Sequence, residues 1–219
     1  HDRSHFEIFA FSFGPNTQDE MNLRIKAGVD KFYNVEKMSN NDIALLSRSL
    51  EIDIAIDLGG FTANNKAEIF AVNPAPIQIN YLGFPSTMGT KFMDYIIADK
   101  TVIPRSMTKC YSEKIICLPN SFMVTDNTRK ISKRVITRSE MGLPEKGFVF
   151  CCFNNNYKIS SNEFDIWMRI LTKVEGSVLW LRRSNKWSSA NFCKEAKKRG
   201  VNPSRLIFAE KVPMEEHLA

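Results

Sequence analysis

Two loops that contain glycine and threonine each follow an apolar strand, and this arrangement constrains the fold most strongly. The strand IAIDL runs into Gly59–Thr62 (GGFT), and the strand IQINYL runs into Gly83–Gly89 (GFPSTMG). Such loops suit a ligand crevice at the carboxyl edge of an open α/β sheet. Glycine allows close backbone approach, and free N–H groups there can hold an anion or a sugar hydroxyl. Ordinary tight turns use the same residues, so loop composition alone leaves both interpretations open.

Strands and helices alternate along the rest of the chain. The β-branched residues of Ile52–Leu58 predict a buried strand. Alternation of this kind predicts an α/β fold with largely parallel sheets. The other expected strands are Phe6–Ser12, Lys31–Val35, Ile77–Leu82, Tyr95–Ala98, Lys114–Leu118, the run GFVFCCF from Gly147, Ser177–Leu181 and Arg205–Ala209. The expected helices are Gln18–Ala27, one opened by Ser39-Asn40-Asn41-Asp42 and continuing through Ser49, a short one after Thr62, one after Ser160, and Ser188–Arg199.

A polar and basic region from Asn120 to Lys146 interrupts this pattern, which restarts at Gly147. We therefore expect a first α/β unit at residues 1–125, a linker at 126–146 and a second unit at 147–219. A short helical lead-in is expected at Thr137–Met141. The second unit has a capping box at Ser160–Glu163. In its first helix the apolar face is expected to hold Phe164, Trp167, Ile170, Leu171 and Val174.

Composition excludes several classes of protein. The chain has 219 residues, of which 43% are hydrophobic and 25% charged, as in ordinary globular proteins. No apolar run reaches the ~18 residues that a membrane helix needs. Five cysteines without a CxxC pair indicate free, buried thiols in a reducing cytoplasm rather than disulfides. The net charge of +6 comes with basic clusters at 129–138 and 194–199, which fit solvated surfaces better than nucleic-acid binding because no aromatic residues alternate with them.

Three residues are candidates for chemistry. Lys158 lies between a strand end and a helix start, where N–H groups favour anions and a lysine can neutralise a pyrophosphate leaving group. A solvated loop lysine is the alternative. His217 reads by itself as an ordinary exposed helix residue, although its flat imidazole ring is able to stack. Asp57 can accept a hydroxyl proton or bind backbone N–H groups. No metal-ligand spacing, P-loop or nucleophile elbow is present.

A family resemblance rests on motifs spread over nearly the whole chain. They include GFT, PAPIQ, LGFPSTMG and DYIIAD in the first half, then YSEK, RSEMGLP, FNNNYKI and EEH. In this order they resemble the O-linked N-acetylglucosamine transferase family, glycosyltransferase family 41. The resemblance implies a GT-B arrangement of two Rossmann-like, doubly wound domains, the second truncated here. It also implies tetratricopeptide repeats upstream.

The activity implied by the resemblance is inverting, metal-independent transfer of N-acetylglucosamine from UDP-GlcNAc to Ser or Thr of a protein, in the cytoplasm and without a cofactor. Some plant relatives use fucosyl-type donors, so the donor is less secure than the reaction class. The family's active-site histidine lies before His1, which predicts that these 219 residues alone are inactive. The implied roles are contact of Lys158 with the nucleotide diphosphate, nucleotide binding by Asn155, Tyr157 and His217, and lining of the sugar or acceptor cleft by Thr62, Gly83, Pro85 and Thr87.

One position departs from the family pattern, and two other functions stay open. Phe61 stands where relatives carry histidine or tyrosine, so a polar role there is in doubt. A non-catalytic α/β binding or scaffold domain would keep the fold and lose uridine-nucleotide binding. Nucleic-acid binding through the basic clusters would show a strong salt dependence.

Overall fold

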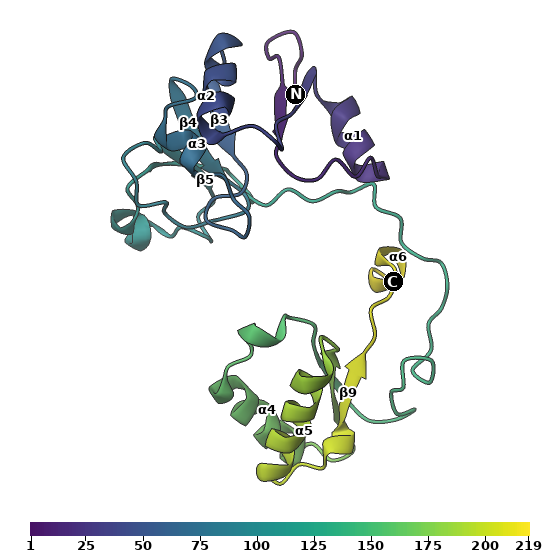
Figure 1. Ribbon diagram of the computed structural model, residues 1–219. Coiled ribbons are helices and arrows are strands. Elements are labelled where there is room, and N and C mark those ends of the chain that lie inside the picture. The colour runs from purple at the N-terminus through teal and green to yellow at the C-terminus, as the bar shows by residue number, and fades with distance from the viewer. The chain divides into compact units, whose positions relative to one another are not determined.

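All strands of this protein pair in parallel, which confirms the expected α/β class (Figure 1). The computed structural model describes residues 1–219 and divides into two compact units, residues 1–125 and 126–219. Unit 1 contains a two-stranded sheet, β1-β2, and a four-stranded sheet, β3-β4-β5-β6; unit 2 contains the sheet β7-β8-β9. The strands are β1 Phe9–Ser12, β2 Lys31–Asn34, β3 Ile54–Asp57, β4 Ile77–Tyr81, β5 Tyr95–Ala98, β6 Lys114–Cys117, β7 Val149–Cys152, β8 Val178–Arg182 and β9 Leu206–Ala209. The helices are α1 Glu20–Gly28, α2 Asn40–Ser49, α3 Glu68–Ala71, α4 Ser161–Lys173, α5 Lys186–Lys198 and α6 Met214–His217.

Helices α2 and α3 form the main core of unit 1 with one face of the strands. This core contains Val35, Ile43 and Phe70, all buried. The prediction of a buried β3 is wrong for half of its residues, because Ile54 and Ile56 are 45% and 47% exposed. Strand side chains alternate between faces, and β3 is the edge strand of its sheet. Its isoleucines therefore point away from the face on which this core packs.

Helices α4 and α5 pack against the sheet of unit 2. The buried residues of α4 are Phe164, Met168 and Leu171. The expected helix face omitted Met168 and included Val174, which follows the helix and is 38% exposed. Ser160 and Glu163 form the expected capping box. Helix α5 begins earlier than expected, because Asn185 caps it by accepting a hydrogen bond from Ser188 N–H.

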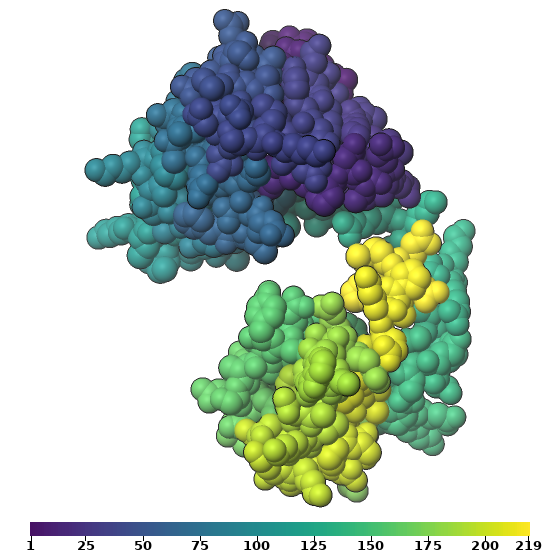
Figure 2. Space-filling view, viewed as in Figure 1, coloured from purple at the N-terminus to yellow at the C-terminus, as the bar shows by residue number.

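The segment 126–146 packs against the last helical turn of unit 2. Ser132 N donates to Glu215 O at 2.9 Å, and Arg134 forms an ion pair with Glu216 at 3.3 Å. Figure 2 shows the yellow α6 turn against this teal segment. The helix expected at Thr137–Met141 is not present, because residues 138–142 form turns. Thr137 and Glu140 still exchange capping hydrogen bonds there, but the chain turns away at Gly142, where φ is +67°.

The cysteines are all free, as expected, but they are not all buried. Cys110, Cys117 and Cys151 are exposed. No helix of the structure combines the length and the apolar character that crossing a bilayer requires.

Candidate functional site

The two glycine loops of unit 1 touch each other at the carboxyl edge of β3 and β4. A Cβ atom on Gly60 would lie 2.3 Å from the Cβ of Phe84, and a Cβ on Gly83 would lie 2.4 Å from the backbone O of Leu58. Gly60 also has a φ of +54°, a backbone conformation that residues with a side chain rarely adopt. The rings of Phe61 and Phe84 meet edge to face at 5.6 Å. Glycine is therefore required at both positions by close approach of one loop to the other.

Two buried polar side chains fix these loops. Oδ1 of Asp57 accepts hydrogen bonds from Gly59 N at 2.8 Å and Gly60 N at 3.0 Å. Nδ2 of Asn80 donates to Phe84 O at 3.0 Å and Ser86 O at 3.1 Å. Because the Asp57 carboxylate is enclosed and bonded to its own loop, the geometry favours its loop-orienting role over proton transfer with a substrate.

The second loop begins with a strained turn. Gly83 N donates to Tyr81 O at 3.0 Å, which makes Leu82 the central residue of a three-residue turn. The φ of Leu82 is +72°. A non-glycine residue in such a γ-turn carries backbone strain, and strain of this kind clusters at ligand-binding sites.

The predicted cleft residues of unit 1 differ in how free they are. Thr62, Gly83 and Pro85 are exposed. The hydroxyl of Thr87 donates to the buried Glu113 at 2.7 Å and accepts from Gly89 N at 3.0 Å. It also accepts from the backbone N–H of Ser112 at 3.3 Å. These three bonds use the donor and both acceptor positions of a hydroxyl, so in this geometry Thr87 shapes the loop and has no hydrogen-bonding capacity left for a ligand.

In unit 2 the loop after β7 carries the predicted nucleotide-binding residues. The chain leaves the strand through Asn155 and a short 3-10 helix, Asn156–Lys158, before α4 begins. The Lys158 ammonium group and the Tyr157 ring, the latter 81% exposed, point into solvent without a hydrogen bond or ion pair within the chain. The loop ends at Ser160, the N-cap of α4, whose backbone N–H donates to the Glu163 carboxylate at 2.8 Å. Hydrogen bonds from the hydroxyl and N–H of Ser160 lower the pKa of Glu163, which keeps the cap ionised near neutral pH.

Arg182 is a site residue that sequence analysis missed. It is the last residue of β8, next to β7, and its guanidinium donates to Asn155 Oδ1. Two cationic side chains, Lys158 and Arg182, therefore follow strand ends of this sheet. Asn155 is hydrogen-bonded to Arg182. Arg182 could have been found in the sequence, because it directly follows the apolar run VLWL and so stands at a strand end.

His217 lies beside the same strand end. Its ring is 6.1 Å from that of Phe153, the first residue after β7, and Phe153 in turn meets Trp180 edge to face at 4.9 Å. Helix α6 is only four residues long, and its residues Glu215 and Glu216 contact the segment 126–146. The structure thus places His217 beside Phe153, the first residue of the loop that also carries Asn155 and Lys158.

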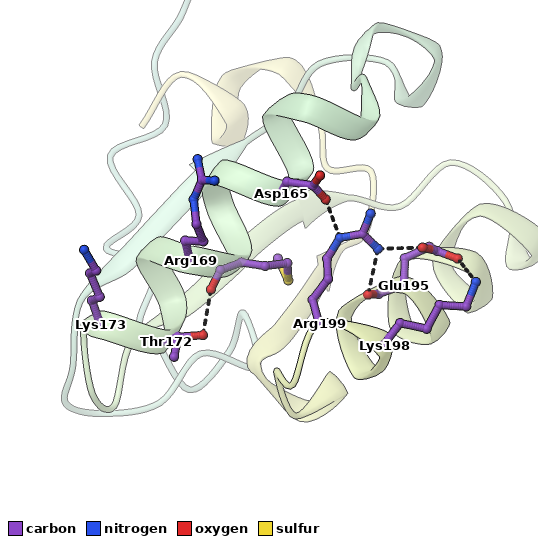
Figure 3. Close-up of a pocket in the computed structure, with 8 residues that line it drawn as sticks. Asp165, Arg169, Thr172, Lys173, Glu195, Lys198 and Arg199 are labelled. Carbon is purple, nitrogen blue, oxygen red and sulfur yellow. Dashed lines mark hydrogen bonds and ion pairs between the residues drawn. The ribbon is translucent and has the colours of Figure 1, made fainter.

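A surface hollow between α4 and α5 contains none of the predicted site residues (Figure 3). Arg199 lies between Asp165 and Glu195 and bonds to both, while Lys198 bonds to Glu195 at 2.6 Å. Hydrogen bonds from Lys198 and Arg199 lower the pKa of Glu195. These four charges pair with one another across α4 and α5, and Arg169 and Lys173 also line the hollow.

Two open parallel sheets with polar loops at their carboxyl edges define an α/β protein of the Rossmann-like class, in which ligands commonly bind at strand ends. A family model described as glycosyl transferase family 41 matches residues 1–134 and 127–219. The chain belongs to glycosyltransferase family 41, as its motifs indicated.

Proteins similar to this chain align with all or nearly all of its residues. A probable UDP-N-acetylglucosamine–peptide N-acetylglucosaminyltransferase SEC from Arabidopsis thaliana is 36% identical over 224 residues, which cover 100% of this chain and 23% of that protein. A UDP-N-acetylglucosamine–peptide N-acetylglucosaminyltransferase from Caenorhabditis elegans is 23% identical and covers 100% of this chain and 29% of its own length. The chain thus spans about a quarter of these relatives. The structure of an O-GlcNAc transferase mutant from Thermobaculum terrenum matches 98% of this chain and 40% of its own, with a TM-score of 0.84 and 25% identity. This match confirms the GT-B-type, Rossmann-like fold.

Proposed function

We propose that this chain is part of the catalytic region of a transferase that moves N-acetylglucosamine from UDP-GlcNAc to Ser or Thr hydroxyls of proteins. The relatives whose names carry this activity align with all of the chain. The observation in the structure that carries the proposal is the loop after β7, which contains Asn155 and Lys158, with His217 beside its first residue and Arg182 on the neighbouring strand.

Each of these residues has a role in the proposed reaction. The acceptor hydroxyl oxygen attacks the anomeric carbon, the bond to the pyrophosphate breaks, the hydroxyl proton passes to the leaving diphosphate, and the configuration inverts. Negative charge then develops on the leaving phosphate, where the unpaired ammonium of Lys158 stabilises it by electrostatic attraction. This role needs neither a metal ion nor a cofactor. His217 provides a flat face for the uracil ring, and Arg182 holds Asn155 in its loop.

In the same proposal, the exposed loops of unit 1 bind the sugar or the acceptor. Thr62, Gly83 and Pro85 line the sugar or acceptor cleft in this proposal, and the rigid contact between the loops keeps that surface in one shape. Thr87 acts through the loop that it anchors. The parent protein is expected to carry tetratricopeptide repeats and to work in the cytoplasm.

Calorimetry with UDP and the full-length parent protein tests the nucleotide site. Lys158→Ala should weaken UDP binding by about 10- to 150-fold, because a hydrogen bond to a charged group contributes about 1.5–3 kcal/mol. Lys173→Ala is the matched control, since that lysine is also exposed but lies in the last turn of α4. Equal UDP affinity of wild type and Lys158→Ala would contradict contact between Lys158 and the phosphates. Absence of UDP binding in the wild type would favour a scaffold role.

Product analysis tests the chemistry. With the full-length parent protein, transfer to a Ser- or Thr-containing peptide should give the β-linked sugar from the α-linked donor, and it should persist in a metal chelator. An α-linked product would contradict inversion, and loss of transfer that added metal restores would contradict metal independence.

A further inference from the structure

Two of the five buried side-chain oxygen atoms of unit 1 that have no hydrogen-bond partner lie on neighbouring strands. They are Oδ2 of Asp57 and Oδ1 of Asn80. Asp57 is 8% exposed and Asn80 is 0% exposed. A buried acceptor without a donor costs about 1–3 kcal/mol, so native proteins rarely leave one unsatisfied.

The two oxygens belong to neighbouring side chains. Asp57 on β3 is in register with Asn80 on β4, and parallel strands lie about 4.8 Å apart. Residues in register share one face of the sheet. The remaining polar atoms of both side chains are already engaged with their own loops, through Gly59 and Gly60 for Asp57 and through Phe84 and Ser86 for Asn80. Turning the Asn80 amide over would satisfy one acceptor and break two hydrogen bonds.

We propose that Asp57 and Asn80 together form a binding site for one internal water molecule that joins the two glycine loops. A water molecule has two hydrogens, and the two in-register side chains offer one unpartnered carboxylate oxygen and one unpartnered amide oxygen. Polar partners of this kind are what buried waters bind. A third unpartnered acceptor, Oε1 of Gln78, lies two residues before Asn80 on the same face and extends the polar strip.

The water completes a chain of hydrogen bonds from one loop to the other. It runs from Gly59 and Gly60 through Asp57, the water and Asn80 to Phe84 and Ser86. Asp57 and Asn80 are therefore positioning residues, and the loops that they hold move as one body. The water site is independent of the proposed transferase activity, whereas its effect on the acceptor cleft rests on that activity.

A crystal structure of the protein at a resolution that shows ordered water tests the site directly. One density peak is expected about 2.6–3.2 Å from both Asp57 Oδ2 and Asn80 Oδ1. The absence of such a peak would overturn the proposal. A side-chain donor in that place, such as the nearby Thr62 hydroxyl, would overturn it as well.

A double-mutant cycle supplies the energetic test. Asp57→Ala and Asn80→Ala should be coupled about tenfold in the unfolding equilibrium constant, because residues in one hydrogen-bond network do not act independently. The control cycle pairs Asp57→Ala with Thr87→Val, which loosens the same loop at its Glu113 anchor and shares no water with Asp57. Coupling within about twofold in the first cycle, or equal coupling in both, would show that no specific link joins Asp57 to Asn80.

Discussion

Replacing Gly83 by alanine should destabilise unit 1 through a single steric contact. The new Cβ would lie 2.4 Å from Leu58 O and 3.4 Å from Gly59 O, and both are backbone atoms at the end of β3. These backbone atoms can make room for the new Cβ only if the loop itself moves. Overpacking of this kind costs about 1–3 kcal/mol. Taking about 2 kcal/mol and a urea m-value of about 2 kcal/mol/M, the unfolding midpoint of unit 1 falls by about 1 M.

Other glycines separate the steric contribution from the backbone contribution. Gly89 has a φ of +63° and open space around a Cβ, so Gly89→Ala measures the left-handed penalty alone, about 1–2 kcal/mol. Gly60→Ala combines both effects and should cost the most. Gly14 has neither constraint, so Gly14→Ala is expected to stay within about 0.5 kcal/mol of wild type.

Circular dichroism in urea provides the assay, with tryptophan fluorescence as an internal control. All three tryptophans, at positions 167, 180 and 187, lie in unit 2. If the units unfold independently, the Gly83→Ala variant shifts only the dichroism transition of unit 1. A midpoint for Gly83→Ala equal to that of Gly14→Ala would refute the close approach of the two loops.

Three further predictions concern other parts of the chain. Ser160→Ala should destabilise unit 2 by about 1 kcal/mol in urea unfolding followed by fluorescence, because it removes the cap of α4; an unchanged midpoint would contradict the cap. The pKa of Asp99 is lowered from 3.8, first by the backbone N–H of Phe122 and then by that of Val102, so its stabilisation is present above the unfolded pKa and is lost as the pH falls through the folded value. Wild type should therefore lose more stability than Asp99→Asn when acidified from pH 5 to pH 3, and parallel losses would count against this. Cys110, Cys117 and Cys151 should react with a thiol reagent in the native state faster than Cys152 and Cys193, which peptide mapping after labelling would show.

Much of the local structure follows from the sequence by itself. Patterns within a few residues predicted Tyr95–Ala98 as a strand with its observed bounds and the capping box at Ser160. They also placed glycine loops at the ends of β3 and β4. These features depend on side-chain period, cap chemistry and glycine's backbone freedom, which act between neighbours in the chain. The ordered motifs likewise identified the glycosyltransferase family.

Tertiary structure alone decided which distant residues meet. The pairing of Asp57 with Asn80, the anchoring of Asn155 by Arg182 and the capture of the Thr87 hydroxyl by Glu113 each join separate segments. The same is true of the exposed isoleucines of β3, whose pattern read as buried. Strand order and register set these contacts, and a sheet's register depends on packing across the whole unit rather than on any short run of residues. A sequence motif can therefore predict where a loop occurs, whereas the residue that holds the loop in place is found only in the tertiary structure.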